Sequence, residues 1–556
     1  MEKRWLEHYP EGIPATINPD EYNSINELFE GSFQKFANRP AFTNMGSTLT
    51  YTEIDKYSKA FASYLRNGLG LKKGDSVAIM MPNVLQYPIC FFGILRAGLI
   101  VTNVNPLYTA RELKHQLNDS EAKAIIIVEN FCSVLQEVVK DTPVQHILTT
   151  QLGDLLNFPK SLLVNTVVKH VKKMVPAFNL PGALSFKDAL KKGQLMPYNK
   201  PDIESDDVAL LQYTGGTTGV SKGAVLTHRN IISNVLQAKA WIKDVIREGE
   251  EVIITPLPLY HIFSLTANCI IFSNIGAENV LITNPRDIPG FVKEISKVQF
   301  TTFTGVNTLF NALVNNEDFK KIDFSKFRLT LGGGMAVQKA VAQKWKAVTG
   351  VTLLEAYGLT ETSPAACINP LNIPDYNGTI GLPIPSTDIS IRDDDGKEVP
   401  LGEPGEICIR GPQVMKGYWK RPDETAKVML EGGWFKSGDI GCMDENGFTT
   451  IVDRKKDMIL VSGFNVYPNE IEDVVAMHAK VLEVAAIGEP HEKSGEVVKV
   501  CVVKNDQSLT KEEIIAHCKE HLTGYKVPKV VEFMDELPKT NVGKVLRRAL
   551  REPVAK

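Results

Sequence analysis

The segment from residue 213 to residue 223 reads YTGGTTGVSKG and concentrates groups that hold phosphate. Glycines let a backbone turn where a side chain would clash, and threonine hydroxyls and a lysine ammonium donate hydrogen bonds. A Walker P-loop is excluded, because Ser221 precedes Lys222 and Gly223 stands where that motif has a hydroxyl. A plain surface turn is the alternative. We predict a phosphate-binding loop made of Tyr213, Thr214, Gly215, Gly216, Thr217, Thr218, Gly219 and Lys222.

Three later segments carry groups suited to a nucleotide. The glycines at 332–334 follow a predicted strand and would let a flat base or a backbone approach closely. The run EAYGLTET offers the aromatic face of Tyr357, the hydroxyl of Thr360 and a carboxylate, Glu361, for magnesium. Asp439, in SGD, is a carboxylate able to accept hydrogen bonds from ribose hydroxyls. Each segment alone is weak evidence, because a tyrosine beside glycine is usually core and an aspartate after glycine usually marks a turn.

The spacing of apolar residues predicts the elements that position these groups. The run at 208–213 indicates a buried strand and the run at 230–236 an amphipathic helix. We therefore expect the phosphate-binding loop to join a strand to a helix. Strand-like and helical patterns alternate from about residue 50 to about residue 440, which is typical of an α/β fold with layered units.

A second, smaller unit follows the charged segment DRKKD at 453–457. Its pattern predicts a compact α+β module with strands at 481–487, 497–503 and 529–533 and a helix at 511–522. We predict two domains, residues 1–454 and residues 455–556.

Bulk composition limits the classes of function. The 556 residues exceed one compact core, and a formal net charge of −3 with mixed signs gives no basis for nucleic-acid binding. We find no signal peptide and no uncharged apolar run long enough to span a membrane, so we expect a cytoplasmic protein. The 8 cysteines are scattered without zinc-like spacing, which favours reduced thiols and no structural metal.

Together the motifs resemble those of the adenylate-forming enzymes, which include acyl-CoA synthetases, luciferases and peptide-synthetase adenylation domains. The resemblance covers essentially the whole chain and rests on YTGGTTGVSKG, YGLTET, GWFKSGDIG, GFTTIVDRKKDMI and LPKTNVGK. Within this superfamily, MEKRWLEHYPEGIP, PLPLYHIFSL and VSGFNVYPNEIEDVV most resemble bacterial long-chain fatty-acid–CoA ligases. Gly215 and Ser221 depart from the broader pattern, which has serine and proline there, and we interpret both as subfamily features.

The resemblance implies a large N-terminal domain of layered α/β subdomains, a small mobile C-terminal α+β domain, and a reaction in two steps. A long-chain fatty carboxylate attacks ATP to give acyl-AMP and diphosphate, and the thiol of CoA then attacks acyl-AMP. Lys544 would bridge the carboxylate and the α-phosphate, and Glu361 and Thr218 would hold Mg²⁺. Besides the phosphate-binding loop, the implied nucleotide contacts are Gly333, Gly334, Glu355, Ala356, Tyr357, Gly358, Thr360, Asp439, Arg454 and Lys544.

Further roles are implied by family positions. Lys456 matches the hinge of a domain rotation that would bring the loop at 462–465 to the CoA thiol, and the acyl tunnel would follow residues 302–309 and 332–334. His261 would assist the thiol or gate its path, and an ordinary core histidine is the alternative. Alternative functions are a medium-chain or aryl-acid CoA ligase, an acyl-AMP ligase that uses no CoA, and a catalytically silent binding protein.

The segment 160–175 carries lysines and an apolar arc but no acidic residue. Leu163, Val164, Val167, Val168, Val171, Met174 and Val175 would share one helical face, opposite Lys169, His170, Lys172 and Lys173. This pattern suits the anionic inner face of a membrane, whereas packing against the large domain is the alternative. We hypothesise peripheral membrane contact here, and also a homodimer.

Overall fold

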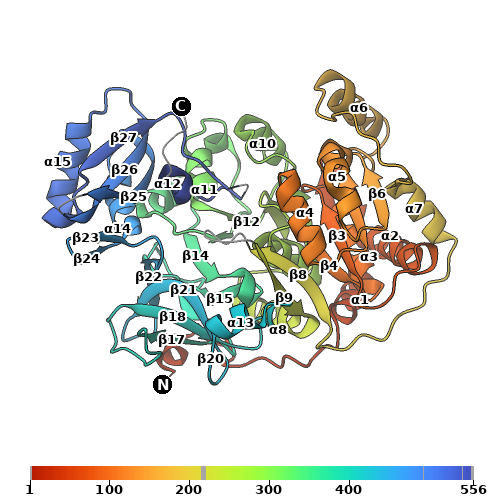
Figure 1. Ribbon diagram of the computed structural model, residues 1–556, viewed down its shortest axis with the longest axis horizontal. Coiled ribbons are helices and arrows are strands. Elements are labelled where there is room, and N and C mark those ends of the chain that lie inside the picture. Colours follow the sequence, from red (N-terminus) through yellow and green to blue (C-terminus); the bar gives the residue numbers. More distant parts are fainter. Residues whose placement is uncertain (1–2, 215–220, 492–493, 541, 552–556) are drawn as a thin grey trace.

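A computed structural model describes residues 3–214, 221–491, 494–540 and 542–551 and contains four sheets. We call residues up to 454 the large domain and residues from 455 the small domain, following the predicted boundary. Figure 1 shows the small domain at one end of the molecule, beside β14 (Leu353–Gly358) and the helices α11 (Asn307–Val314) and α12 (Lys339–Thr349). The fold class, α/β layers followed by a small α+β unit, is confirmed.

The large domain is built on two extended sheets. One has nine strands in the order β16 (Leu382–Pro383), β15 (Ala365–Ile368), β14 (Leu353–Gly358), β13 (Leu329–Gly332), β12 (Thr302–Gly305), β10 (Val252–Thr255), β11 (Glu278–Leu281), β1 (Pro40–Asn44) and β2 (Ser47–Thr50). The other has eight, in the order β19 (Gly417–Tyr418), β9 (Lys222–Thr227), β8 (Val208–Thr214), β4 (Ile100–Asn103), β3 (Ser76–Met80), β5 (Ala124–Val128), β6 (His146–Thr150) and β7 (Leu184–Ser185).

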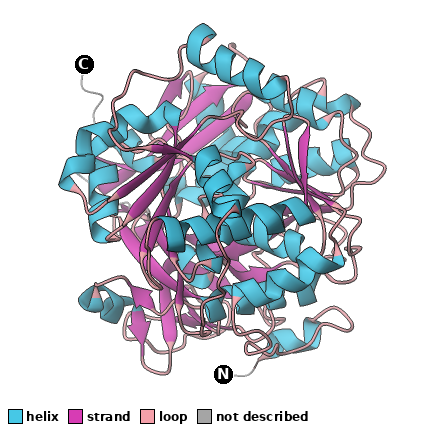
Figure 2. Ribbon diagram, turned by 90° about the vertical axis from the view of Figure 1, so that its right-hand side faces the viewer, coloured by secondary structure: helices cyan, strands magenta, loops and turns pink. Residues whose placement is uncertain are grey.

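Helices cover the faces of these sheets and lie between them (Figure 2). Strands such as β5, with the sequence AIIIV, are buried at every position because parallel strands carry helices on both faces. The helices of the large domain include α1 (Ile25–Lys35), α2 (Tyr51–Ser63), α3 (Gln86–Arg96), α4 (Ala110–Asp119), α5 (Cys132–Val138), α6 (Lys160–Thr166), α7 (Phe186–Gln194), α8 (His228–Ile242), α10 (Ile288–Ile295) and α13 (Pro422–Val428).

Two smaller sheets complete the structure. The third belongs to the large domain and consists of β17 (Asp388–Arg392), β18 (Gly405–Arg410), β21 (Trp434–Met443), β20 (Met429–Leu430) and β22 (Thr449–Arg454). The fourth forms the small domain, with β24 (Phe464–Val466), β23 (Ile459–Val461), β26 (Gly495–Lys504), β25 (Val481–His491) and β27 (Val530–Met534). Helices α14 (Pro468–Ala476) and α15 (Lys511–His521) share the apolar core of this sheet, and α16 (Arg547–Arg551) follows.

One expected connection is wrong. The phosphate-binding loop joins two antiparallel strands, β8 and β9, rather than a strand and a helix, and Tyr213 pairs with Gly223 across them. Helix α8 begins only after β9, where Thr227 and Asn230 form a capping box. The sequence KGAVLT therefore continues the sheet for six residues before the chain turns into the helix. Among the described residues, no helix combines the length and apolar character needed to cross a membrane.

Candidate active site

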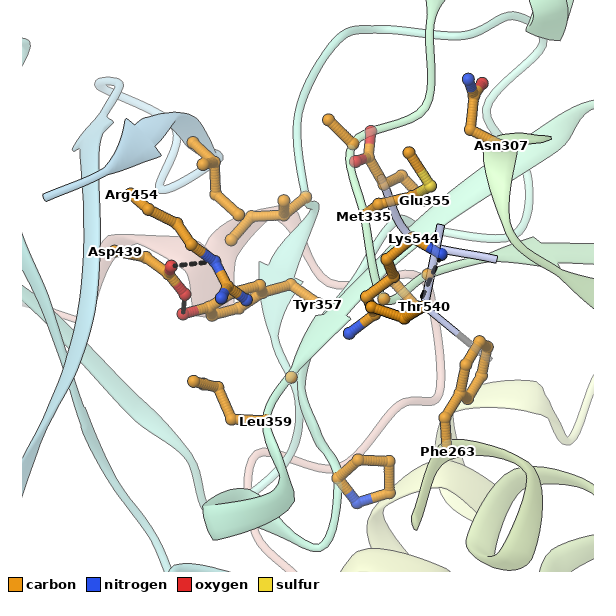
Figure 3. A pocket seen from close by; sticks show the side chains of 18 of the residues that line it. Phe263, Asn307, Met335, Glu355, Tyr357, Leu359, Asp439, Arg454, Thr540 and Lys544 are labelled. Atoms are coloured by element: carbon orange, nitrogen blue, oxygen red, sulfur yellow. Dashed lines mark hydrogen bonds and ion pairs between the residues drawn. The ribbon is translucent and has the colours of Figure 1, made fainter. Parts of the chain in front are cut away.

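A cavity of about 1330 Å³ lies between the two domains. Its walls come from β13, β14, β21, β22 and the ends of β8 and β9 in the large domain, and from α14, β25 and the residues around Lys544 in the small domain. Figure 3 shows Tyr357, Asp439 and Arg454 on one side of the cavity and Lys544 on the other. Residues far apart in the sequence are thus brought to one site.

Glu361 is a buried carboxylate in this wall. It lies in the 3₁₀ turn η8 (Thr360–Thr362), directly after β14, and is 8% exposed. The Tyr418 hydroxyl donates to Glu361 Oε1 over 2.7 Å, and Lys222 Nζ lies 4.4 Å from the centre of the Tyr418 ring. Burial raises the pKa of Glu361, while the Tyr418 hydrogen bond and the charges of Lys222 and Arg454 lower it. A desolvated carboxylate of this kind is stabilised by a neighbouring cation.

Asp439 anchors a second group of contacts. It lies on β21 in register with Arg454 on β22, and it is 6% exposed. The Tyr357 hydroxyl donates to Asp439 Oδ2 over 2.7 Å, and Arg454 Nε lies 3.5 Å from Asp439 Oδ1. The dashed lines in Figure 3 mark both contacts. The Tyr357 hydroxyl therefore fixes the aspartate while its ring forms part of the cavity wall.

Lys544 enters the cavity from the small domain. Its segment forms a tight turn in which Thr540 N donates to Lys544 O over 2.6 Å and Lys544 N donates to Thr540 Oγ1 over 3.1 Å. A Cβ at Gly334, which has φ +77°, would lie 3.2 Å from Lys544 Cε, so glycine leaves room for the lysine. Burial and then the Arg454 charge lower the pKa of Lys544 to about 8, against the opposing charges of Asp439 and Glu361. The ammonium thus feels both carboxylates of the opposite wall.

His261 lies just before α9 (Ile262–Ser264), where its Nδ1 accepts a hydrogen bond from Phe263 N over 3.4 Å. Burial and then the Lys544 charge lower the pKa of His261 to about 3, so the ring is neutral near pH 7. A neutral imidazole whose Nδ1 accepts a hydrogen bond carries its proton on Nε2. The ring is therefore suited to donate a hydrogen bond into the cavity rather than to take a proton through Nδ1.

The other predicted residues fall into two groups. Those that the structure describes also line the cavity: Tyr213, Thr214, Lys222, Gly333, Glu355, Ala356, Gly358 and Thr360. The Tyr213 hydroxyl donates to Asp119 Oδ2 over 2.7 Å, so its polar end is occupied within the large domain. Gly215, Gly216, Thr217, Thr218 and Gly219 lie outside the described residues. The individual roles of all these residues stay predictions.

Glu355 has an environment unlike that of Glu361. It is 7% exposed, and its Oε1 accepts a hydrogen bond from Val337 N over 3.2 Å. Burial raises the pKa of Glu355 to about 8, the Val337 amide lowers it, and the charge of Asp473 across the cavity raises it further. Glu355 is therefore largely neutral near pH 7, whereas the Lys222 and Arg454 charges help Glu361 to ionise.

Part of the cavity wall is apolar and more than nine-tenths buried. We call this set the apolar wall; it consists of Ala238, Ile242, Ile271, Phe272, Ile368 and Ile380. Helix α8 and the π-helical segment η6 (Leu265–Phe272) supply four of its members. Of the predicted acyl-tunnel residues, Thr304, Asn307, Thr308, Gly333 and Gly334 line the cavity.

Sequence reasoning missed the apolar wall and also Tyr418. One signal for the wall was present: Asn234, Ala238 and Ile242 recur every four residues and so share one face of α8, with a small side chain in the middle. Tyr418 gave no such signal, because its contact with Glu361 joins residues 57 positions apart.

Comparison with known proteins agrees with this geometry. A family model described as AMP-binding enzyme matches residues 29–419, and one described as AMP-binding enzyme C-terminal domain matches residues 470–544. A long-chain-fatty-acid–CoA ligase from Yersinia pestis is 61% identical over 556 residues, covering 100% of this chain and 99% of that protein. A protein of the same name from Escherichia coli O6:H1 is 58% identical over 552 residues, covering 99% and 98%.

A solved structure is similar over almost the same length. The anthranilate CoA ligase AuaEII in complex with anthranoyl-AMP superimposes with a TM-score of 0.85 at 26% identity, covering 96% of this chain and 98% of that chain. The two family models together cover most of the chain, and the relatives cover nearly all of it. The chain therefore belongs to the AMP-binding enzyme family, within the superfamily of adenylate-forming enzymes.

Proposed function

We propose that this protein joins long-chain fatty acids to CoA through an acyl-adenylate. In the first step, a fatty carboxylate attacks the α-phosphate of ATP and diphosphate leaves. In the second step, the CoA thiol attacks the acyl carbonyl and AMP leaves. The observation that carries the proposal is one cavity that holds Lys544, two buried carboxylates and an apolar wall. The near-full-length relatives named for this activity support it.

The first step must overcome repulsion between a carboxylate and a triphosphate. Lys544, placed across from Glu361 and Asp439, supplies the positive charge that stabilises the developing transition state and holds both reactants together. Asp439, which Tyr357 and Arg454 hold in place, would accept hydrogen bonds from the ribose hydroxyls, and the Tyr357 ring would stack on adenine. Lys222 and the loop at 214–219 would contact the outer phosphates.

Glu361 fits a magnesium site. Mg²⁺ prefers oxygen ligands and is commonly held by one or two carboxylates together with substrate phosphates. Burial disfavours the negative charge of Glu361, and a bound cation would offset that cost. Glu361 and Thr218 would hold the ion, which when bound would screen the charge of the triphosphate. Thr218 lies outside the described residues.

The apolar wall favours a long acyl chain over a short or aryl acid. Each methylene moved from water to such a surface contributes about 0.8 kcal/mol. A sixteen-carbon chain can therefore gain far more from Ala238, Ile242, Phe272 and their neighbours than benzoate can. This difference favours long-chain activity over the alternative of an aryl-acid ligase.

In the proposed second step the CoA thiol must reach the acyl carbonyl in the cavity that Lys544 lines. We propose that the small domain, residues 455–556, rotates about the segment 453–457 with Lys456 as the hinge, withdrawing Lys544. The hairpin at 462–465 would then face the thiol. In this structure Phe464 is 56% exposed and stacks on Tyr525, with ring centroids 4.9 Å apart. His261 would meet the thiol or the acyl carbonyl through its Nε2 proton.

The test supplies purified protein with magnesium-ATP and palmitate, octanoate or benzoate, each with and without CoA, and follows diphosphate, AMP and acyl-CoA. We expect palmitoyl-CoA to form fastest and only when CoA is present. Acyl-AMP that accumulates despite CoA would favour the acyl-AMP ligase, and faster turnover of octanoate or benzoate would favour the corresponding shorter-chain or aryl ligase. Absence of diphosphate with all three acids would favour a binding protein.

We also propose peripheral membrane contact through residues 158–174. Figure 1 shows α6 projecting from the body of the large domain. The exposed apolar side chains here are Phe158 (84%), Leu162 (63%), Leu163 (63%), Val171 (70%) and Met174 (52%). Lys172 and Lys173 are exposed beside them. Apolar side chains next to lysines favour an anionic lipid surface.

The predicted apolar arc differs from this surface. The helix changes to a π-helical turn over Val167–Val171 and then ends, so the expected single face is split. Val164, Val167, Val168 and Val175 are partly buried, and Val164 packs against the large-domain core. Leu162, which lies outside the predicted apolar arc, is also among the exposed apolar side chains.

Sedimentation with vesicles that contain or lack phosphatidylglycerol tests this contact. We expect binding to anionic vesicles to fall at least about 10²-fold when Lys169, Lys172 and Lys173 are changed to glutamate, since each lysine near such a surface contributes about 1 kcal/mol. Lys519→Glu, at an exposed position on α15, is the control. Unchanged binding of the triple variant would contradict the proposal. The homodimer stays a prediction that light scattering can measure.

A further inference from the structure

We propose that Arg547 is a positioning residue for the first step only: its ion pair with Asp453 fixes the Lys544 turn against the large domain and must break before the second step. This inference rests on the proposed two-step reaction. Arg547 begins α16, three residues after Lys544, so its side chain determines where the end of the Lys544 turn lies.

Arg547 is the centre of a dense polar cluster. Its Nη2 donates to Asn469 Oδ1 over 2.7 Å and lies 2.9 Å from Glu472 Oε2, and its Nε donates to Glu472 Oε1 over 3.0 Å. These contacts join α16 to α14 within the small domain. Its Nη1 lies 3.4 Å from Asp453 Oδ1 and 3.6 Å from Asp457 Oδ2. One guanidinium therefore contacts both domains and the segment that joins them.

Asp453 is the first residue of the joining segment and is anchored in the large domain. It lies on β22, where it pairs in register with Ile440 of β21, next to Asp439. A second bond crosses the same boundary, because Asn469 N donates to Asp453 Oδ2 over 2.9 Å. The position of Lys544 relative to Asp439 is thus set through Asp453, Arg547 and the two residues that separate Arg547 from Lys544.

Burial makes this contact consequential. The side chain of Asp453 is 1% exposed and that of Arg547 is 15% exposed. Removing one partner of a buried ion pair leaves an uncompensated charge, which is strongly unfavourable. Consistent with this, burial raises the pKa of Asp453 to about 6, and the Arg547 charge and two backbone amides lower it. The arrangement with Lys544 in the cavity is therefore the one in which this carboxylate is compensated.

The other end of the Lys544 turn is held independently. Thr308 Oγ1, on α11, donates to Gly543 O over 2.9 Å. Asn311 Nδ2, one helical turn later, donates to Leu482 O over 2.8 Å. The turn is thus fixed on one side by a large-domain hydroxyl and on the other by Arg547. Both contacts cross the domain boundary, so a rotation that withdraws Lys544 must break them.

Separate assays of the two steps test the proposal. The first step is measured as diphosphate release from ATP and palmitate without CoA, and the second as palmitoyl-CoA formation from supplied palmitoyl-AMP and CoA. In Arg547→Gln and Asp453→Asn we expect the first rate to fall at least tenfold, because displacing a catalytic group by about 1 Å can cost about 10²-fold. We expect the second rate to stay within about twofold.

Two further variants sharpen the result. Thr308→Val removes one hydroxyl and leaves the Arg547 cluster intact, so the same selective loss is expected, and Arg547→Lys should recover part of the first rate. Lys499→Gln is the matched control, because Lys499 is 17% exposed and pairs with Glu532 and Glu489 inside the small domain alone. It should change neither step.

Equal loss of both steps in folded Asp453→Asn and Thr308→Val, or no loss in either, would overturn the proposal. If Arg547→Gln does not fold, judged by its circular dichroism spectrum, these two variants decide. If the unchanged protein releases no diphosphate with any acid, the proposed function itself fails. If it releases diphosphate normally and the variants show no selective loss, only the role of Arg547 fails.

Discussion

The two walls of the cavity are held in different ways. The large-domain wall carries Glu361 and Asp439, which are buried, follow or lie on strands, and accept hydrogen bonds from Tyr418 and Tyr357 of the same domain. The small-domain wall carries Lys544 on a short turn. The turn is secured to the large domain by side-chain contacts such as Thr308 to Gly543 and Arg547 to Asp453.

This difference fits the proposal that one cavity serves two reactions. In the proposed reaction, the groups that bind the nucleotide are needed in both steps, and the pairing of β21 with β22 fixes Asp439 and Arg454 in the large domain. Lys544, which the proposal needs only in the first step, is held against the large domain by side-chain contacts that can break without unfolding either sheet. The small domain supports this independence, because its sheet has an apolar core of its own, built from residues such as Ile459, Val500 and Ile514.

The largest expected effect comes from removing the charge of Lys544 on the small-domain wall. Lys544→Ala should lower the first step by about 10²- to 10³-fold, the usual loss when one preorganised group that stabilises transition-state charge is removed. The second step, measured from supplied palmitoyl-AMP, should change by less than about threefold. Diphosphate release and palmitoyl-CoA formation are the two measurements.

A matched change on the fixed wall should behave differently. Asp439→Asn should impair both steps, because both use the bound nucleotide. A variant of Lys544 that slows both steps equally, or a variant of Asp439 that slows only one, would contradict this picture. In it, the large-domain wall acts in both steps and Lys544 on the small-domain wall acts only in the first.

Sequence predicted the local features of this architecture well. The helix predicted at 511–522 and the strand predicted at 529–533 agree with α15 and β27 to within one residue at each end, because the pattern of apolar residues is a local signal. The main local error was β9, whose sequence KGAVLT is buried at five of six positions and therefore lacks the alternation that marks a half-exposed strand. The basic helix was misjudged for a related reason, since its π-helical turn shifts the phase of the helical wheel.

The site could be predicted only in part. Tyr357, Glu361 and Asp439 lie within short motifs that predict nucleotide contacts, whereas Lys544 was predicted only through the family resemblance of LPKTNVGK. All four residues line the cavity. Arg547 was not predicted, because its meaning depends on Asp453, 94 positions away, and on a packing arrangement that no single motif encodes. What the sequence does not specify locally is how the two walls meet.

A change in the apolar wall should alter the preference for acyl-chain length rather than the mechanism. Ala238 is 5% exposed in the middle of the apolar wall, so Ala238→Phe would fill space that a long chain needs. We expect the ratio of kcat/KM for palmitate to that for octanoate to fall about tenfold, a typical consequence of one to two methylenes lost from a pocket. Kinetics with both acids at saturating ATP and CoA give this ratio.

Overpacking can also lower stability, by about 1–3 kcal/mol, so a control is required. Ala342→Phe fits this purpose, because Ala342 is 2% exposed on α12 and packs within a different core cluster. It should lower the melting temperature without changing the ratio. If Ala342→Phe shifts the ratio as much as Ala238→Phe does, the apolar wall does not determine chain length.

The smallest effect expected is in the pH dependence, and it compares the two walls directly. Lys544 must be charged to act, and its pKa is lowered to about 8. The pH dependence of kcat/KM for the first step reports the pKa values of the free enzyme. We therefore expect kcat/KM to be at its maximum below pH 7, to be halved near pH 8 and to fall about tenfold per pH unit above pH 9. His261 does not contribute to this limb, because its pKa of about 3 leaves it neutral throughout.

Glu355 on the large-domain wall could also cause the fall in kcat/KM, since its pKa of about 8 means that it gains negative charge over the same pH range. Lys544→Arg distinguishes the two groups, because a guanidinium stays protonated at pH 10. If Lys544 causes the limb, this variant loses it and Glu355→Gln keeps it. The reverse result would assign the fall in kcat/KM at high pH to Glu355, and Lys544 would then stay charged over the whole pH range.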